Sequence, residues 1–230
     1  SASPAHVYRI YGLSYGHSLF PKHKVFENGD PSESISFEWL FWMIQGKDRA
    51  LLVDTGFDDS DLARRWGISN YVKPEKRLAQ LGITADQVTD VILTHAHWDH
   101  LGSLGFYRNA NIWIQKKEFE YMKLMVGPNN PEARGMRWRD LQELIAVEKQ
   151  GRLRLLSGRA VPAEGISITP GGYHTPGSQY VTVEMVDGPV IVAGDATYMY
   201  RNNQMHIPIG STIDATGNLQ TIRRMHRKVA

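Results

Sequence analysis

Cysteine is absent from the 230 residues of this sequence. The chain therefore has neither a disulfide framework nor thiolate ligands for a metal ion. No run of about eighteen apolar residues occurs, so no segment has the composition of a membrane-spanning helix. Basic and acidic residues nearly balance, at 26 and 24, with a formal net charge of +2. The balance gives no sign of a basic surface, and we expect neither nucleic acid nor a membrane as a partner.

The length of the chain suits one α/β domain. No linker, internal repeat or low-complexity segment divides it, so we expect a single domain over residues 1–230. The chain begins Ser-Ala-Ser-Pro without a methionine, which fits either a processed signal peptide or a remnant of cloning. A chain without cysteine suits both cytoplasm and periplasm, so the location stays open.

Short apolar and branched runs bounded by turn residues predict the strands of an α/β protein. The expected strands are 7–13, 37–45, 50–53, 91–93, 111–115, 153–156, 166–169, 180–186 and 190–193. Helices are expected at 74–81, at 219–228 and in two parts across 116–150, a segment that is either core-facing or a lid or dimer surface. The aromatic and histidine-rich residues between 15 and 26 are expected to form a loop of the kind that can line a pocket.

One short segment carries most of the chemistry. It reads Thr-His-Ala-His-Trp-Asp-His-Leu-Gly, from Thr94 to Gly102, and follows an apolar run. His95 and His97 stand two residues apart, so an extended backbone points both the same way. Asp99 and His100 come next, where a turn can aim them at a second position. Imidazole and carboxylate ligands suit Zn²⁺, and also Fe or Mn, so the segment predicts a metal site with a helix starting near Gly102.

This segment resembles the His-x-His-x-Asp-His signature of the metallo-β-lactamase superfamily. Three further stretches resemble landmarks of that family, in the same order along the chain. They are Leu-Leu-Val-Asp-Thr-Gly at 51–56, Gly-Gly-Tyr-His-Thr-Pro-Gly-Ser-Gln at 171–179 and Val-Ile-Val-Ala-Gly-Asp-Ala-Thr-Tyr at 190–198. The resemblance implies an αβ/βα sandwich, in which two mixed sheets face each other with helices outside.

The resemblance also implies a role for each matching residue. Asp54 would lie beneath the histidine segment and orient a ligand. His174 would be the third histidine on one metal, with His95 and His97. Asp195 would bridge two metals, and a carboxylate at the end of an apolar strand is costly unless it is paired or bound to metal.

The family has a final histidine about forty residues after the bridging aspartate. This sequence ends 35 residues after Asp195, so we expect that ligand to lie beyond Ala230. His206 follows Asp195 too closely to replace it. His226 lies in an Arg- and Lys-rich helix and is interpreted as a surface residue.

A dinuclear site of this kind implies hydrolysis without a protein nucleophile. A hydroxide held between two zinc ions would attack an acyl carbon, and one ion would stabilise the oxyanion. Asp99, a ligand of the second ion with His100, would pass a proton to the leaving group.

Tyr198 narrows the choice of substrate. The stretch Asp195-Ala196-Thr197-Tyr198 resembles the quorum-quenching acyl-homoserine lactone lactonases and the pyridoxolactonase-like enzymes, whose tyrosine contacts the substrate carbonyl. The resemblance therefore implies a lactone or similar ester as substrate. Ser178 departs from the histidine that many relatives carry there, which weakens assignment to any one subfamily.

Other functions stay open. A glyoxalase II-like thioesterase needs the same metals, and a mononuclear-iron persulfide dioxygenase needs only some of these ligands. A β-lactamase is disfavoured because Asp195 resembles a bridging ligand, and a nuclease because the chain has no basic surface by composition. A non-catalytic metal-binding scaffold and a homodimer also remain open.

Overall fold

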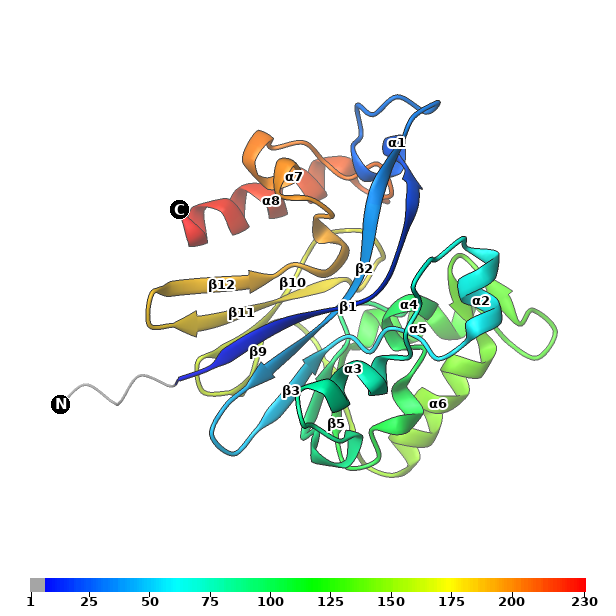
Figure 1. The fold of residues 1–230 in the computed structure, drawn as a ribbon, viewed down its shortest axis with the longest axis vertical. Helices are drawn as coiled ribbons and strands as arrows, with labels where there is room; N and C mark the ends of the chain where they lie inside the picture. Colours follow the sequence, from blue (N-terminus) through cyan, green and yellow to red (C-terminus); the bar gives the residue numbers. More distant parts are fainter. Residues whose placement is uncertain (1–6) are drawn as a thin grey trace.

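The computed structural model describes residues 7–230. Two sheets packed face to face form its centre, with helices on the outer face of each (Figure 1). Across the first sheet the strands are β1 (Arg9–Pro21), β2 (Ser34–Gln45), β3 (Ala50–Val53), β4 (Asp90–Ile92), β5 (Asn111–Gln115) and β8 (Leu153–Leu156). The pairs β1–β2 and β2–β3 are antiparallel, and the pairs from β3 to β8 are parallel. Parallel strands end at one edge, so the segments after β3, β4 and β5 meet there.

The second sheet has four antiparallel strands. In order across the sheet they are β12 (Gly188–Val192), β11 (Gln179–Met185), β10 (Ile166–Pro170) and β9 (Ala160–Ala163). The loop that joins β10 to β11 and the segment that follows β12 lie at the same end of this sheet, because Val181 pairs with Val192 and Pro170 pairs with Gln179. Each sheet therefore offers one end to a shared site.

Helices cover the outer faces. They are α1 (Lys22–Val25), α2 (Ser60–Arg65), α3 (Pro74–Gln80), α4 (Trp98–Leu101), α5 (Lys116–Met125), α6 (Trp138–Lys149), α7 (Tyr200–Met205) and α8 (Ala215–Val229). A short hairpin of β6 (Glu132–Ala133) and β7 (Met136–Arg137) joins α5 to α6. Within residues 7–230, no helix combines the length and apolar content that crossing a membrane requires.

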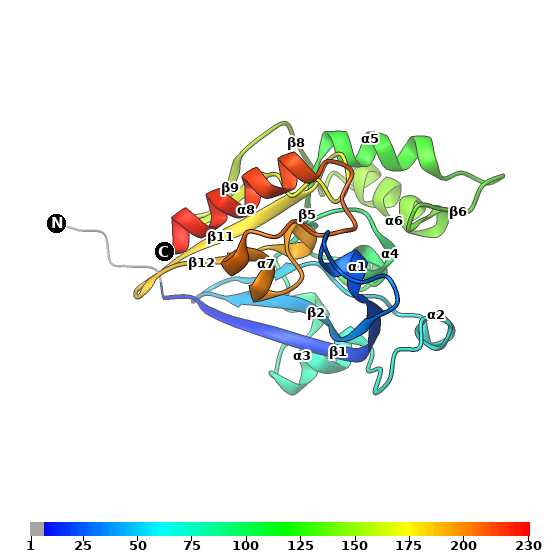
Figure 2. The ribbon, with the colours of Figure 1, turned by 90° about the horizontal axis from the view of Figure 1, so that it is seen from above.

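Three apolar clusters correspond to the interfaces between layers. Side chains such as Leu51, Ile92 and Val183 fill the space between the two sheets. A larger cluster joins the outer face of the first sheet to α2–α6, and a small one that includes Ile222 joins the second sheet to α8. Figure 2 shows α8 lying along the second sheet, on the side away from the first. The predicted αβ/βα sandwich is confirmed by these layers.

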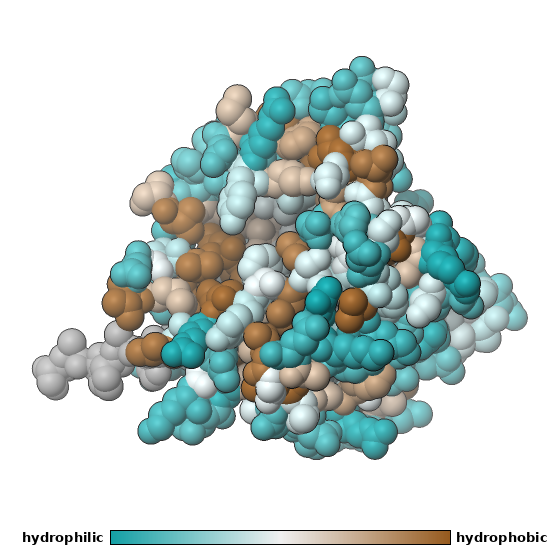
Figure 3. Space-filling model, in the orientation of Figure 1, coloured by the Kyte–Doolittle hydropathy of each residue, from teal (hydrophilic) through white to brown (hydrophobic). Residues whose placement is uncertain are grey.

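Apolar side chains also reach the surface. In the space-filling view (Figure 3), brown residues gather near the middle of this face, inside a mostly hydrophilic periphery. Trp42 and Met185 are among the half-buried residues that pack on the cluster between the sheets. Such side chains extend the core between the sheets toward the surface.

Most predicted elements are confirmed to within a few residues, and two expectations are wrong. The segment 15–26 is no loop: residues to Pro21 continue β1, with a register irregularity between Ser14 and Gly16, and α1 follows. Polar residues and glycine at the bulge hide this strand pattern. Strand β9 has no counterpart among the predicted strands; it contains Pro162, which is tolerated because β9 lies at the edge of its sheet. The second wrong expectation concerns the histidine segment.

Candidate metal centre

The histidine segment begins where β4 leaves the core. His95 and His97 follow, His97 in extended backbone, and their ring centroids lie 4.5 Å apart. Helix α4 then begins at Trp98, inside the motif, and Gly102 is its C-terminal cap. The prediction of a helix starting near Gly102 is therefore wrong. The helix has to start earlier because its first turn carries Asp99 and His100 toward the other histidines.

Asp54 lies directly under this segment. It follows β3 with φ at +64°, a left-handed conformation that aspartate tolerates better than most residues. Its Oδ1 accepts a hydrogen bond from the Thr94 backbone N–H at 2.8 Å, and its Oδ2 lies 2.7 Å from His100 Nδ1. The carboxylate therefore fixes both the start of the segment and the orientation of the His100 ring.

His174 comes from the loop between β10 and β11. Its Nδ1 lies 2.5 Å from the carbonyl oxygen of Ser211, to which it donates a hydrogen bond in the tautomer that leaves Nε2 free. That Nε2 lies 3.1 Å from His97 Nδ1. Tyr173, just before it, holds a φ of +56°, which is an outlier for a bulky residue. The loop thus accepts local strain to aim His174 at the histidine segment.

Asp195 follows β12 and faces the histidines. Gly194 allows the approach, because a Cβ at that position would lie 2.7 Å from the Thr94 side chain. Asp195 Oδ2 lies 3.2 Å from His174 Nε2 and 3.8 Å from His95 Nε2. Its Oδ1 lies 3.3 Å from His100 Nε2, which is also 3.2 Å from Asp99 Oδ2. The six predicted ligands are therefore brought together from both sheets.

These separations fit metal coordination. Tetrahedral ligands 2.0–2.2 Å from one ion stand about 3.3 to 3.6 Å from each other, and the nitrogen and oxygen atoms here span 3.1 to 3.8 Å. Two groups of ligand atoms gather closely within the described residues, His95 with His97 and His174, and His95 with His100 and Asp195. His95 Nε2 is buried without a hydrogen-bond partner in that part of the chain. A metal ion would satisfy this nitrogen, so the residues fit the group that the motif implies.

Burial and mutual contact set the charges. Burial lowers the pKa of His95 well below its usual value and that of His97 to about 3, so both rings are neutral, as metal ligands must be. Burial also acts to lower the pKa of His100, but Asp99, Asp195 and Asp54 outweigh it and raise that pKa. Burial acts to raise the pKa of Asp195, yet His100 and His174 hold it below its usual range. His95 and His97 are therefore neutral imidazoles, whereas the carboxylates around His100 favour its charged form, and Asp195 is ionised.

Glu118 is a site-supporting residue that sequence reasoning missed. It lies in the first turn of α5, fully buried. Its carboxylate accepts hydrogen bonds from the Ala96 N–H at 2.9 Å, the Gly177 N–H at 2.8 Å and Thr175 Oγ1 at 2.9 Å. Burial raises the pKa of Glu118, and these hydrogen bonds lower it in part. No sequence pattern marks it, because two of its three partners are backbone groups.

Two tyrosines border the centre. Tyr198 Oη lies 3.5 Å from His174 Nδ1, and burial raises its pKa well above the usual value. Tyr15, placed by the sequence in a loop that can line a pocket, is instead a core side chain on β1. Its hydroxyl donates a hydrogen bond to the Asp99 carbonyl oxygen at 3.0 Å.

The remaining histidines considered from sequence lie apart from the two ligand groups. His206 is exposed, and its ring is 5.0 Å from that of half-buried His226. Ser178, where many relatives were expected to have histidine, hydrogen-bonds Thr175. It therefore shapes the His174 loop.

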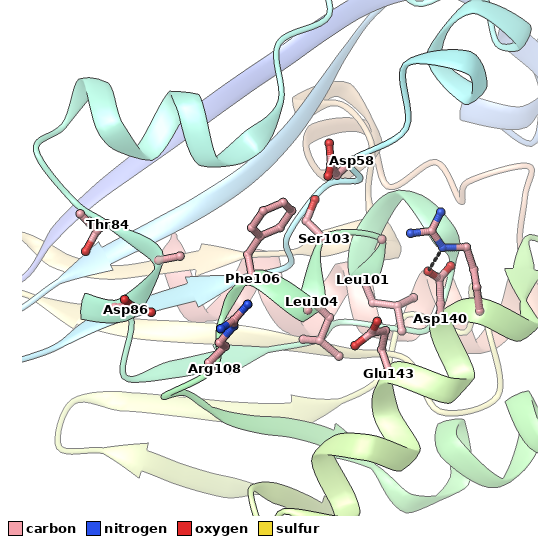
Figure 4. Close-up of a pocket in the computed structure, with 14 residues that line it drawn as sticks. Asp58, Thr84, Asp86, Leu101, Ser103, Leu104, Phe106, Arg108, Asp140 and Glu143 are labelled. Carbon is pink, nitrogen blue, oxygen red and sulfur yellow. Dashed lines mark ion pairs between the residues drawn. The ribbon is translucent and has the colours of Figure 1, made fainter.

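A cavity of about 200 Å³ opens beside the histidines. Its lining includes His97, His174, Tyr121 and Arg134. A larger cavity of about 520 Å³ lies between α4 and α6, where Figure 4 shows Ser103, Glu143 and Asp140 around it. None of the six predicted ligands lines the larger cavity. The smaller cavity therefore gives access to one side of the ligand groups, through His97 and His174.

Comparison with known proteins agrees with this geometry. The model of a family described as the metallo-beta-lactamase superfamily matches residues 40–227. The chain belongs to the metallo-beta-lactamase superfamily. An N-acyl homoserine lactonase from a Bacillus species is 24% identical over 246 aligned positions, covering 97% of this chain and 89% of the relative.

Solved structures share the fold. One is an N-acyl homoserine lactone hydrolase with the product N-hexanoyl-L-homoserine at its catalytic metal centre, with a TM-score of 0.77, 19% identity and coverage of 97% of this chain and 89% of that one. Another is AidC, a dizinc quorum-quenching lactonase in complex with the same product, with a TM-score of 0.72, 16% identity and coverage of 97% and 84%. Family membership and the clustered ligand atoms together make this protein a metal-dependent hydrolase.

Proposed function

We propose that the protein is a dinuclear metal-dependent hydrolase that opens lactones, with N-acyl homoserine lactones or similar esters as substrates. The observation that carries the proposal is the position of Asp195. Its two oxygens face different histidines, Oδ2 toward His174 and Oδ1 toward His100. A carboxylate placed in this way suits a bridge between two metal ions. The named activities of the relatives, which act on N-acyl homoserine lactones, support the choice of substrate.

The ligands divide between two ions. His95, His97 and His174 would hold one, Asp99 and His100 would hold the other, and Asp195 would contact both. Imidazole and carboxylate donors suit zinc, and iron or manganese accept the same set. When bound, the ions would lower the pKa of water and polarise the carbonyl group of an ester.

Asp99 would carry the proton in this reaction. Its side chain is 19% exposed, so it reaches both the site and solvent. A carboxylate there can take a proton from the attacking water and give it to the alkoxide that leaves when the ring opens. The hydrogen bond from Tyr15 to the Asp99 carbonyl oxygen fixes the backbone at this point.

Tyr198 would stabilise the charge that develops on the carbonyl oxygen. Burial raises the pKa of its phenol, so the group stays protonated and can donate a hydrogen bond. Its contact with His174 Nδ1 is long, at 3.5 Å, and that nitrogen already has Ser211 as a partner. Side-chain hydrogen bonds with Ser211 and Asp195 also act on the phenol, so a substrate carbonyl oxygen would take the place of one of these partners.

A continuous group of aromatic rings leads away from Tyr198. We call it the aromatic wall; its members are Phe20, Phe37, Trp39, Trp66 and Trp98. The Phe37 ring lies 5.6 Å from Tyr198 and 4.7 Å from Phe20, and Trp39 links Phe37 to Trp98. Trp66 remains 43% exposed at the far end. Trp39 and Trp98 are buried in the core, whereas Phe20, Phe37 and Trp66 are partly exposed, and these three would favour an apolar acyl group attached to the lactone.

One observation favours a thioesterase as the second candidate. Arg134 lines the small cavity with His97 and His174, and makes no ion pair within residues 7–230. A guanidinium in this position would bind a carboxylate. A thioester with an anionic acyl or thiol part would use that contact, whereas a neutral lactone would not.

A substrate panel tests the proposal. Purified protein is offered neutral acyl lactones, anionic thioesters and β-lactams, and hydrolysis is followed by proton release. We expect turnover of lactones with apolar acyl chains. The variant His97→Ala should lose this turnover, because it removes a ligand that lies 3.1 Å from His174.

His226→Ala is the matched control, because it removes a histidine outside the ligand groups and should keep full activity. Faster turnover of anionic thioesters, lost in Arg134→Ala, would replace the lactonase proposal with the thioesterase. Oxygen uptake without proton release would contradict both and indicate a dioxygenase. Absence of any turnover in loaded protein would leave a non-catalytic scaffold.

A further inference from the structure

The buried carboxylate of Glu118 connects two segments that come from different sheets. Ala96, whose N–H it accepts, lies between His95 and His97 on the segment after β4. Gly177 and Thr175, its other partners, lie on the loop that carries His174 between β10 and β11. One side chain therefore joins the two loops that supply three histidines to the same position.

The His174 loop also packs closely against the backbone of Glu118. A Cβ at Gly177 would lie 2.3 Å from the Glu118 backbone nitrogen and 2.5 Å from its Cβ. Only glycine allows the His174 loop to rest directly on the first turn of α5. A carboxylate in the first turn of a helix is also favoured by the helix dipole, which offsets part of the cost of burial.

We propose that Glu118 is a positioning residue that holds the His95–His97 segment and the His174 loop at the separation that one metal ion requires. This inference rests on the proposed metal centre. Glu118 does not face the reacting atoms; it acts through the backbone of its partners. Its substitution should weaken metal binding before any question of substrate arises.

Glutamine is the sharpest substitution. Both carboxylate oxygens of Glu118 accept a hydrogen bond from a backbone N–H. Oε1 accepts from Ala96, and Oε2 accepts from Gly177. Glutamine offers one acceptor and one NH₂ group, so in either orientation one N–H faces another donor. Thr175 can adapt, because its hydroxyl also lies 2.9 Å from Ser178 Oγ. One of the two loops must therefore move, while size and shape are conserved.

The experiment is a metal titration, independent of activity. Metal-free wild-type protein and Glu118→Gln are titrated with Co²⁺, and the visible ligand-field absorption reports affinity and geometry. Loss of an outer hydrogen bond to a metal site costs about 10- to 100-fold in affinity, and we expect that loss for the Co²⁺ ion held by His95, His97 and His174, with altered band intensities. Gly177→Ala, which forces the same loop away without removing the carboxylate, should give the same change.

Two controls separate positioning from stability. Glu120→Gln, an exposed neighbour on α5 paired with Lys123, should bind Co²⁺ as the wild type does. Asp140→Asn breaks a buried carboxylate contact with Arg137 away from the centre, so it should lower the melting temperature without changing Co²⁺ affinity. Glu118→Gln protein that melts early but binds Co²⁺ within twofold of wild type would overturn the inference alone. Wild-type protein that binds no Co²⁺ would overturn it together with the metal centre.

Discussion

Replacement of Asp54 by asparagine is predicted to weaken the binding of one metal ion selectively, namely the ion held by His100. Asp54 Oδ2 lies 2.7 Å from His100 Nδ1, and its Oδ1 accepts the Thr94 N–H. A carboxylate obliges Nδ1 to donate, which leaves the lone pair of Nε2 free. That Nε2 is the atom that faces Asp99 and Asp195. Asp54 therefore selects the tautomer that can bind a metal.

Asparagine cannot satisfy both contacts. If its oxygen stays on the Thr94 N–H, its NH₂ faces His100 Nδ1 and favours the tautomer with the proton on Nε2, which blocks the ligand atom. If the amide turns round, its NH₂ faces the Thr94 N–H, and a buried donor without a partner costs about 1–3 kcal/mol. Either way we expect the ion at His100 to bind about 10- to 100-fold more weakly, and the ion at His97 and His174 to change little.

The assay is competition for zinc with a chromophoric chelator, which resolves the tighter and weaker ions. Asp90→Asn is the matched control: Asp90 is equally buried, on β4, and accepts from Trp113 Nε1 at 2.9 Å. Asparagine oxygen can still accept there, so its zinc binding should equal that of the wild type. Asp54→Asn protein that keeps both affinities would refute the tautomer argument.

Three further predictions follow from the same structure. Trp98→Ala should lower the free energy of unfolding by about 3–5 kcal/mol in urea titrations, because this large side chain is only 7% exposed and packs on Phe57 and Trp39. A loss under about 1 kcal/mol would contradict the place of Trp98 in the core. Tyr198→Phe should lower kcat for lactones by roughly 100-fold with little change in KM or metal content, as for one oxyanion donor, and an unchanged kcat would exclude that role. Metal-free protein should lose stability in acid, because burial lowers the pKa of His97 from 6.5 to about 3 in the folded state. The stabilisation from neutral His97 is complete above pH 6.5 and falls as the pH drops toward 3. His100, whose pKa is raised, contributes its full stabilisation throughout that window. Equal free energies of unfolding at pH 7 and pH 4.5 would contradict this prediction.

The contiguous part of the site could be predicted from the sequence. His95, His97, Asp99 and His100 lie within six residues after an apolar strand, so chain connectivity alone keeps them together. His174 and Asp195 could be assigned only by resemblance, because no local pattern says that two loops of the second sheet face the first. The structure brings both within 3.3 Å of the other ligands.

Glu118 shows what sequence reasoning misses. In Lys-Lys-Glu it looks like an exposed residue at the start of a charged helix. It is buried because β5 runs parallel beside β4, which brings the start of α5 against the histidine segment. Its partners include two backbone N–H groups, and any residue type supplies those. Tertiary placement, rather than local propensity, therefore decides its role.

Metal content measured by elemental analysis tests the central claim most directly. The account predicts about two zinc ions per chain in wild-type protein, and fewer than two after Asp195→Asn, which weakens the carboxylate between the two histidine groups. One iron ion per chain would contradict the dinuclear hydrolase and favour the dioxygenase. Protein without any tightly bound metal would contradict the metal centre itself.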